Sequence, residues 1–384
     1  MGVGQHRRRA RDVDLPPQTT TEHINLREGR GTRYMKFTHV SLPQRVTFAS
    51  GEAPAAVAAE VAVLGGSKVM LIASAREKML ADPIAAEIPV ALRYEDVVMH
   101  VPVEVAVRAR EAATACGADL VVSVGGGSST GLAKAVAMTT GLPIVAVPTT
   151  YAGSEATNVW GLTKGGTKTT GIDPGVLPAS IVYDANLLTT LPGDMTVASG
   201  LNAMAHCIDA MWAPRADPID QALAGEGIRS LATGLPKVAA EPGDLAGIEE
   251  TLYGAYLAAV SFASAGSGMH HKICHVLGGL FNLPHAQTHA VVLPHVLAFN
   301  APHAPAAERR IAAAFDAPTA LEGLAALHKT LNAPNALKDY GMPEDGIAKA
   351  LDPILRAIPD DNPTPVTEDT LAALLKAAWE GDIP

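Results

Sequence analysis

The sequence predicts an α/β domain with a parallel sheet, followed by an all-α domain. The chain has 384 residues, more than one ordinary core requires, so two domains of about 150–200 residues each are expected. Buried-strand patterns alternate with helical patterns up to about residue 191, whereas only helical patterns follow. The composition is 48% hydrophobic but only 4% aromatic, which is typical of packed helices and buried parallel strands rich in Ala, Val and Leu.

The α/β domain is expected to span residues 35–191, after a disordered tail or extension over residues 1–34. Buried apolar runs predict strands, and amphipathic runs predict helices between them. In chain order these are a strand at 68–74, a helix at 102–116, a strand at 120–124, a helix at 129–140 and a strand at 143–147. Glycines follow both helices, at 117 and 141, where chains commonly leave a helix. This alternation predicts a doubly wound parallel sheet.

The helical domain is expected to span residues 192–384. One apolar stripe shows the helical period most clearly, at Ile248, Leu252, Ala255, Tyr256 and Ala259. Near the end of the chain, Thr367 is predicted to cap a helix that has acidic residues in its first turn and leucines behind them.

Charge and cysteine content restrict the class of partner. The formal net charge is −10, and no basic block occurs within the body of the chain, so nucleic acid and anionic membranes are not expected partners. The apolar stretches are too short for a membrane span. Cys116, Cys207 and Cys274 are widely spaced, which matches neither a disulfide framework nor a cysteine zinc site and indicates the reducing cytoplasm. A small-molecule ligand is therefore expected.

A glycine turn connects the strand at 120–124 to the helix that follows it. Its residues are Gly125, Gly126, Gly127 and Ser128. Glycines let the backbone approach a pyrophosphate, and the helix N-terminus offers unpaired N–H groups and a favourable dipole. The alternative is a tight turn that serves only the fold. Its place at the carboxyl end of a buried strand favours a Rossmann-like dinucleotide site.

Two further segments are expected to line the same crevice. Thr149, Thr150 and Ser154 follow the next strand along the chain, where their hydroxyl groups could bind the cofactor. Ser74 ends the first predicted strand, and Arg76 lies two residues later, where an acidic residue would otherwise bind the adenosine ribose. The sequence therefore leaves the choice between NADH and NADPH open.

Polar side chains recur at helical spacing in the second half. Asn202 and His206 lie four residues apart, as do His271 and His275, and His285 follows after a proline. Residues four apart share a helix face, so these groups could converge on one functional cleft. Lys272, next to His271, could add positive charge or simply face solvent.

Four motifs, GGGSSTGLAK, PTTYAGSEAT, GLNAMAH and HHKICHVLGGLFNLPH, resemble the iron-containing alcohol dehydrogenase superfamily and, within it, the maleylacetate reductases. In the metal-dependent members an Asp and three His hold the ion, at the positions of Asn202, His206, His271 and His285. Asn202 removes the anionic ligand. Gly131 stands where metal-dependent relatives have Asp, and the loop PTTYAGSE is one residue shorter than theirs. The resemblance therefore implies a homodimeric enzyme that works without metal.

The resemblance implies NADH- or NADPH-dependent reduction of the conjugated double bond of maleylacetate to 3-oxoadipate. Negative charge then builds on the ketone oxygen, so hydrogen-bond donors or cations must be aimed there and a proton must be supplied. We expect His206, His271 and His285 to occupy the vacated metal site and bind the ketone or a carboxylate. Lys272 would add charge, and His275 would lie nearest the nicotinamide.

Three other interpretations share the fold or the nucleotide site. The first is an iron- or zinc-dependent alcohol or polyol dehydrogenase, against which Asn202 argues. The second is a lyase similar to dehydroquinate synthase, which needs an acidic metal ligand and several cations near the histidines that are not seen. The third is a nucleotide-binding protein without catalysis.

Overall fold

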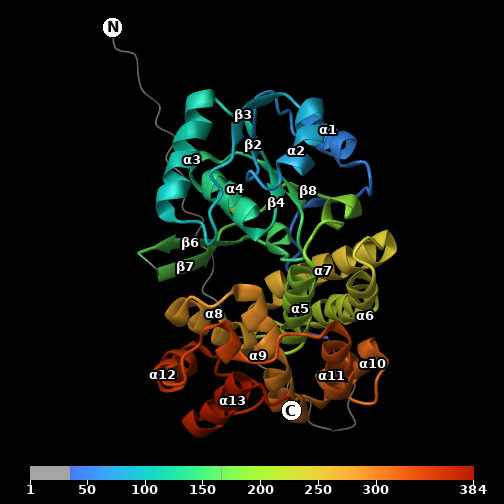
Figure 1. Ribbon diagram of the computed structural model, residues 1–384, viewed down its shortest axis with the longest axis vertical. Coiled ribbons are helices and arrows are strands. Elements are labelled where there is room, and N and C mark those ends of the chain that lie inside the picture. The colour runs from blue at the N-terminus through green and yellow to red at the C-terminus, as the bar shows by residue number, and fades with distance from the viewer. Residues whose placement is uncertain (1–34, 166) are drawn as a thin grey trace. The chain divides into compact units, whose positions relative to one another are not determined.

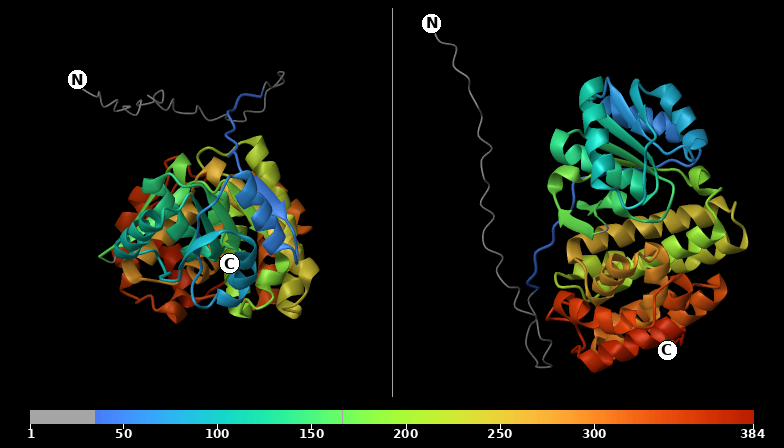
Figure 2. Two further views of the ribbon diagram at one scale, coloured as in Figure 1. Left: turned by 90° about the horizontal axis from the view of Figure 1, so that it is seen from above. Right: turned by 60° about the vertical axis from the view of Figure 1, so that its left-hand side comes forward.

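The computed structural model describes residues 35–165 and 167–384 (Figure 1). The predicted tail at 1–34 lies outside the described residues. Residues Thr38–Pro384 form one compact unit, and the predicted boundary at 191–192 remains a prediction. The parallel strands and the helices beside them come first, and a helical part follows along the chain (Figure 2).

A six-stranded sheet organises the first part of this unit. Its strand order is β1-β8-β5-β4-β2-β3, and every pairing in it is parallel. The strands are β1 (Arg45–Phe48), β2 (Val69–Ile72), β3 (Val90–Tyr94), β4 (Leu120–Gly125), β5 (Ile144–Pro148) and β8 (Ser180–Tyr183). Strands β2, β4 and β5 confirm the three predicted strands, with β4 and β5 at the centre of the sheet.

Helices cover both faces of the sheet, as the apolar strands require. The helices are α1 (Ala53–Val63), α2 (Lys78–Glu87), α3 (Val103–Cys116) and α4 (Gly127–Thr140). Alternate strand residues serve the two faces: Leu71 packs in one cluster with α1 and α2, and Met70 packs in the other with α3 and α4. Gly117 and Gly141 end α3 and α4 in the left-handed conformation, which confirms both predicted helix ends.

A small hairpin lies outside the predicted elements. Strands β6 (Val159–Lys164) and β7 (Thr167–Ile172) form a two-stranded antiparallel sheet. No residue of β6 is fully buried, so the sequence shows no buried apolar run that would predict this strand.

The second part of the unit is helical, as predicted. Its first three helices pack at close range because glycines line the contact: a Cβ on Gly254 would stand 3.0 Å from the carbonyl oxygen of Gly227. Thr367 caps the last helix, as predicted. The helices are α5 (Gly193–Ala210), α6 (Pro218–Ala240), α7 (Leu245–Ala265), α8 (Met269–Phe281), α9 (His285–Asn300), α10 (Pro305–Phe315), α11 (Ala320–Leu331), α12 (Gly346–Ala357) and α13 (Glu368–Glu380). None of the described helices is both long and apolar enough to cross a membrane.

Candidate active site

The glycine turn between β4 and α4 has the geometry of a phosphate cradle. Gly125 has φ +144°, a conformation that side chains other than glycine rarely adopt. Gly126 is the N-cap of α4 and has no side chain that could cap the helix. The first N–H groups of α4 therefore receive no hydrogen bond from an N-cap side chain. A Cβ on Gly126 would lie 3.0 Å from the Thr150 side chain. The absence of side chains here therefore leaves room for an anion at the helix N-terminus.

The loop after β5 lies beside this turn. The backbone N–H of Thr149 donates to the carbonyl oxygen of Gly125 at 3.2 Å, and Thr150 faces Gly126. The structure thus brings the glycine turn together with Thr149 and Thr150. Ser154 begins the next turn of the chain, and its carbonyl oxygen accepts a hydrogen bond from the Lys134 ammonium at 2.7 Å.

Lys134 is a buried cation that the sequence-based analysis did not identify. Its Nζ donates to three carbonyl oxygens, those of Ser154, Thr157 and Val159, at 2.7–2.8 Å. Burial lowers the pKa of Lys134 to about 7, and the nearby Glu155 acts against this shift. Lys134 therefore connects α4 to the segment after β5 and holds the two together.

The end of β2 differs from expectation. The sequence places no acidic residue directly after this strand, yet the structure brings the Glu77 carboxyl group to the glycine turn, 3.7 Å from where a Cβ on Gly125 would stand. The Ser74 hydroxyl donates to Glu77. Arg76 is exposed. The start of α2 thus brings a carboxyl group to the glycine turn, although no acidic residue directly follows β2 in the sequence.

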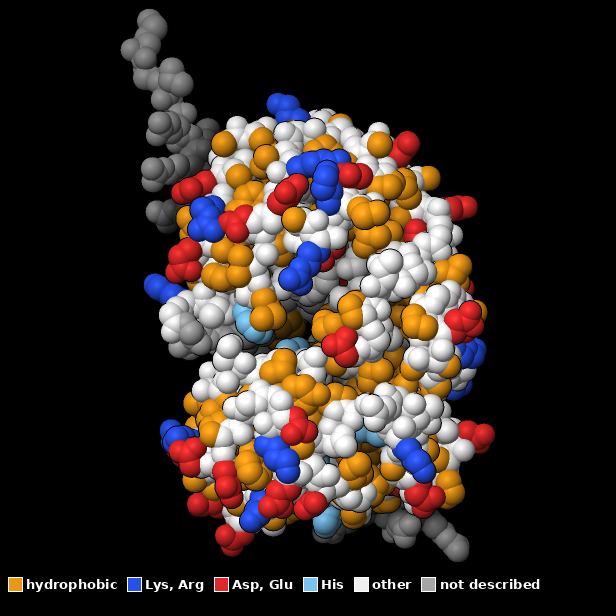
Figure 3. Space-filling view, viewed as in Figure 1, with side chains coloured by type: hydrophobic (Ala, Val, Ile, Leu, Met, Phe, Trp, Pro, Cys, Tyr) orange, Lys and Arg blue, Asp and Glu red, His pale blue; other side chains and the backbone are white. Residues whose placement is uncertain are grey.

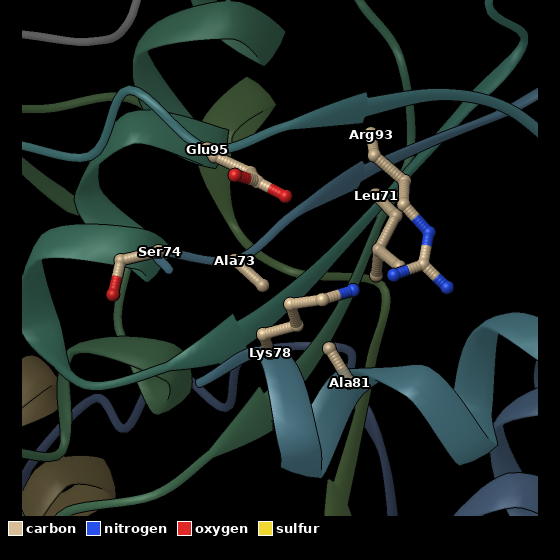
Figure 4. A pocket seen from close by; sticks show the side chains of 7 residues that line it. All are labelled: Leu71, Ala73, Ser74, Lys78, Ala81, Arg93 and Glu95. Atoms are coloured by element: carbon tan, nitrogen blue, oxygen red, sulfur yellow. The ribbon is translucent and has the colours of Figure 1, made fainter. Parts of the chain in front are cut away.

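A small pocket lies beside this position (Figure 4). Lys78 and Arg93 enter it with their cationic groups, and Glu95 lies at its opposite side. Both cations also pair with Asp82. The role of Arg76 in the choice of cofactor stays a prediction, and Lys78 and Arg93 are two further cations in the same region.

Helices α5, α8 and α9 bring the predicted histidines together. The rings of His206 and His271 stack with centroids 4.9 Å apart and an angle of 15° between their planes. The chain of rings continues to His289 at 4.8 Å from His271, and from His289 to His285 at 4.4 Å. His275 stacks on His285 at 6.2 Å. Histidine side chains are visible in the hollow that crosses the face shown in Figure 3.

The cluster has a buried end and an exposed end. His206 and His271 are buried, as is Asn202, whereas His275 and His285 are exposed. The Oδ1 of Asn202, the Nδ1 of His206 and the Nε2 of His271 have no hydrogen-bond partner within the described part of the chain. Unsatisfied buried polar atoms are costly, so these three atoms indicate a place where a polar ligand binds.

The cluster lies directly against the loop that follows β5. A Cβ on Gly153 would stand 3.7 Å from the Nδ1 of His206 and 2.8 Å from the Cβ of Ala259. Glycine at this position, with φ +77°, therefore lets the cofactor-side loop approach the histidines. Lys272 is half-buried on α8, about 100° around the helix axis from His271.

Asp209 is the main site residue that the sequence-based analysis missed. Its Oδ2 lies 2.7 Å from the Nδ1 of His271 and accepts the backbone N–H of Gly268 at 2.8 Å. Burial raises the pKa of Asp209 to about 7, while the backbone N–H groups of Gly268, His271 and His270 act in the opposite direction. A carboxylate behind an imidazole fixes the ring orientation and directs its second nitrogen outward.

Burial also determines the charge of the inner histidines. Desolvation lowers the pKa of His206 to about 4 and that of His270 to about 3, and it lowers those of His271 and His289 well below the usual value. Burial therefore favours the neutral form of these inner imidazoles before an anion binds. Phe262 packs on His206 and His271, at 4.7 and 4.3 Å, and helps to exclude water.

Comparison with known proteins shows to which family the chain belongs. The sequence profile of iron-containing alcohol dehydrogenase matches residues 43–185, and the profile of the C-terminal part of the same family matches residues 196–379. The chain belongs to the iron-containing alcohol dehydrogenase family. The predicted family and fold class are thus confirmed.

Curated relatives between 40 and 45% identical to the chain are maleylacetate reductases. Maleylacetate reductase 2 of Cupriavidus pinatubonensis is 45% identical over 346 residues, which are 89% of this chain and 96% of the relative. Among solved structures, the iron-containing alcohol dehydrogenase of Corynebacterium glutamicum is 60% identical with a TM-score of 0.90, covering 91% of this chain and 98% of that one. The maleylacetate reductase of a Rhizobium species is 40% identical with a TM-score of 0.86, covering 91% and 100%.

Family membership raises the question of whether this member's residues fit iron or zinc. The donors at the family's ligand positions are one amide and three imidazoles, so the anionic ligand is missing. The residues at these positions therefore differ from the ligand set that the resemblance implies for the metal-dependent members. Two other groups of described residues have donor atoms within 4.8 Å of one another: His270 with Cys274 and His289, and His39 with Asp217 and Asp220.

Proposed function

We propose that this family member is a maleylacetate reductase that reduces the conjugated double bond of maleylacetate to 3-oxoadipate with NADH or NADPH and without a metal ion. One observation carries this proposal: a buried cluster of neutral imidazoles, with Asn202 in place of a carboxylate, lies against the loop beside the glycine turn. Relatives named maleylacetate reductase, at 40–45% identity over about nine-tenths of the chain, support the same substrate.

The cofactor would lie between the two parts of the site. The glycine turn of Gly125, Gly126, Gly127 and Ser128 would hold its pyrophosphate, and Ser74 with Glu77 would meet the adenosine ribose. Thr149, Thr150 and Ser154 would line the crevice toward the histidines. When bound, the reduced nicotinamide supplies the hydride. The acidic Glu77 favours NADH, because a carboxylate repels the additional phosphate of NADPH.

This preference can be tested with Glu77→Gln, which keeps the side-chain shape and removes the charge. We expect the ratio of kcat/KM for NADPH to that for NADH to rise by about ten-fold, equivalent to about 1.4 kcal/mol. Glu87→Gln, at the exposed far end of the same helix α2, should leave the ratio unchanged. An unchanged ratio in Glu77→Gln would remove this residue from the cofactor site.

The inner polar groups would stabilise the charge that develops on the substrate. Hydride addition to the double bond moves an electron pair onto the ketone oxygen, which becomes an enolate. The Asn202 amide and the His206 imidazole would donate hydrogen bonds to this oxygen, in a buried setting where such bonds are strong. Lys272, His275 and His285 would bind the substrate carboxylates at the more exposed end of the cluster.

The Asp209–His271 pair would supply the proton. Asp209 accepts the hydrogen bond of His271 Nδ1–H and stabilises the imidazolium that forms when the dianionic substrate enters. The proton on Nε2 of His271 would then move to the carbon next to the ketone, and the enolate electron pair forms the new C–H bond. The ring returns to its neutral form and must be reprotonated from solvent before the next turnover.

The test is steady-state reduction of maleylacetate, followed by the absorbance of NADH at 340 nm, before and after dialysis against EDTA. We expect turnover to be unchanged by the chelator, because Asn202, His206 and His271 supply hydrogen bonds rather than metal ligands. A loss of more than ten-fold that iron or zinc restores would contradict the metal-free mechanism. Oxidation of a simple alcohol without any reduction of maleylacetate would assign the chain to the metal-dependent dehydrogenases instead.

A further inference from the structure

A second cluster of polar side chains lies outside the histidine cluster. Its members are His39, in the segment before β1, Asp217, the N-cap of α6, and Asp220, in the first turn of α6. The Nδ1 of His39 lies 2.9 Å from Oδ2 of Asp217 and 3.6 Å from Oδ1 of Asp220. The hydroxyl group of Ser264, near the end of α7, lies 3.4 Å from the same nitrogen.

The two carboxylates are buried without enough positive charge around them. The side chains of Asp217 and Asp220 are 3% and 0% exposed, and His39 is 11% exposed. Neither oxygen of Asp220 has a hydrogen-bond partner in the described part of the chain. Burying a charged carboxylate without a hydrogen-bond partner costs free energy of folding, so the cluster lacks a positively charged or hydrogen-bonding partner for Asp220.

The separations also fit ligands of one bound cation, which would replace the hydrogen bond between His39 and Asp217. Two ligands bound to zinc at about 2.0–2.1 Å in a tetrahedron lie about 3.3 Å apart, and the observed separations of 2.9 and 3.6 Å fall on either side of that value. The two carboxylate oxygens of Asp217 have different partners. Oδ1 caps the helix by accepting the N–H groups of Ile219 and Asp220, and Oδ2 faces His39, where it could bind an ion.

We propose that His39, Asp217 and Asp220 bind one divalent transition-metal cation, of which Zn²⁺ best matches the donor set, at a structural site separate from the histidine cluster. The ion would neutralise the two carboxylates, with Ser264 as a fourth oxygen donor. It would tie the segment before β1 to the start of α6 and the end of α7. A metal ion found in the purified protein would then belong to this site, and its removal would change stability rather than turnover.

The test uses the full chain, dialysed first against EDTA and then against micromolar Zn²⁺ followed by metal-free buffer, with the bound zinc measured by mass spectrometry. We expect about one zinc per chain in the wild type and a melting temperature about 5 °C higher than that of the chelated protein. Asp217→Asn keeps a good helix cap, and Asp220→Asn removes an uncompensated buried charge, so both variants should fold. Both should lose the bound zinc and the melting shift, with the turnover of maleylacetate unchanged.

Glu226→Gln, on the exposed side of α6, is the matched control and should keep both the ion and the shift. Wild-type protein without zinc after this treatment would overturn the proposal. Full zinc content in both aspartate variants would also overturn it, because the ion would then lie elsewhere, such as at His270, Cys274 and His289. Loss of zinc and of turnover together in Asp220→Asn would contradict the separation of the two sites. The zinc content and the melting shift do not depend on whether maleylacetate is the substrate, so a failure of the proposed function would leave these two measurements valid.

Discussion

Replacing Asp209 by Asn is expected to lower kcat for maleylacetate by about 10³-fold, while the affinity for NADH changes by less than about three-fold. The amide retains the shape of the carboxylate and can still accept the N–H groups of Gly268 and His271. It carries no charge, so it cannot stabilise the imidazolium of His271 that delivers the proton. Stopped-flow measurement of hydride transfer and fluorescence titration with NADH would separate the two effects.

A purely structural role for Asp209 would give a different pattern. It would lower the melting temperature and weaken cofactor binding and turnover together. Asp209→Glu keeps the charge and should recover part of the activity, and Asp194→Asn, in the exposed first turn of the same helix α5, should behave as the wild type. Equal losses in kcat and NADH affinity for Asp209→Asn would rule out the proposed role in proton transfer.

The Asp209–His271 contact shows where sequence patterns stop being informative. Four-residue spacing predicted that Asn202 and His206 share one helix face, and that His271 and His275 share another. Which residue of α5 faces α8 depends on the register between two helices, and Asp209 lies 62 residues from its partner. No local periodicity encodes that register, so a buried carboxylate near the end of α5 could not be paired from the sequence.

On the cofactor side, too, some residues could be predicted from the sequence and others could not. The glycine turn was predictable because both its residue type and its place between a strand and a helix are local properties. Glu77 was missed because its carboxyl group reaches the turn only through the path of the chain after β2. Lys134 lies within a recognisable motif, but its burial and its carbonyl partners on the following loop depend on packing between α4 and that loop. Residues that connect distant segments, such as Lys134, are thus harder to predict from the sequence than glycines that form a turn between a strand and a helix.

Gly125→Ala is expected to weaken NADH binding by about 30-fold, equivalent to about 2 kcal/mol. The residue has φ +144°, and its new Cβ would stand 2.3 Å from the Oγ of Ser129 in the first turn of α4. Either the turn changes conformation or Ser129 is pushed away, and both displace the N–H groups that would receive the pyrophosphate. Titration of NADH fluorescence gives the dissociation constant, and kcat at saturating NADH should fall much less.

Gly141→Ala provides the matched control, because Gly141 ends the same helix with φ +71° and a Cβ there would meet nothing within 4 Å. A left-handed alanine at position 141 should cost about 1 kcal/mol of stability. At position 125 the close contact with Ser129 adds to that cost. Gly125→Ala should therefore lower the melting temperature more than Gly141→Ala, and only Gly125→Ala should lose NADH affinity. If both variants bound NADH equally, the turn between β4 and α4 would be a structural feature alone, and the pyrophosphate would have to bind elsewhere.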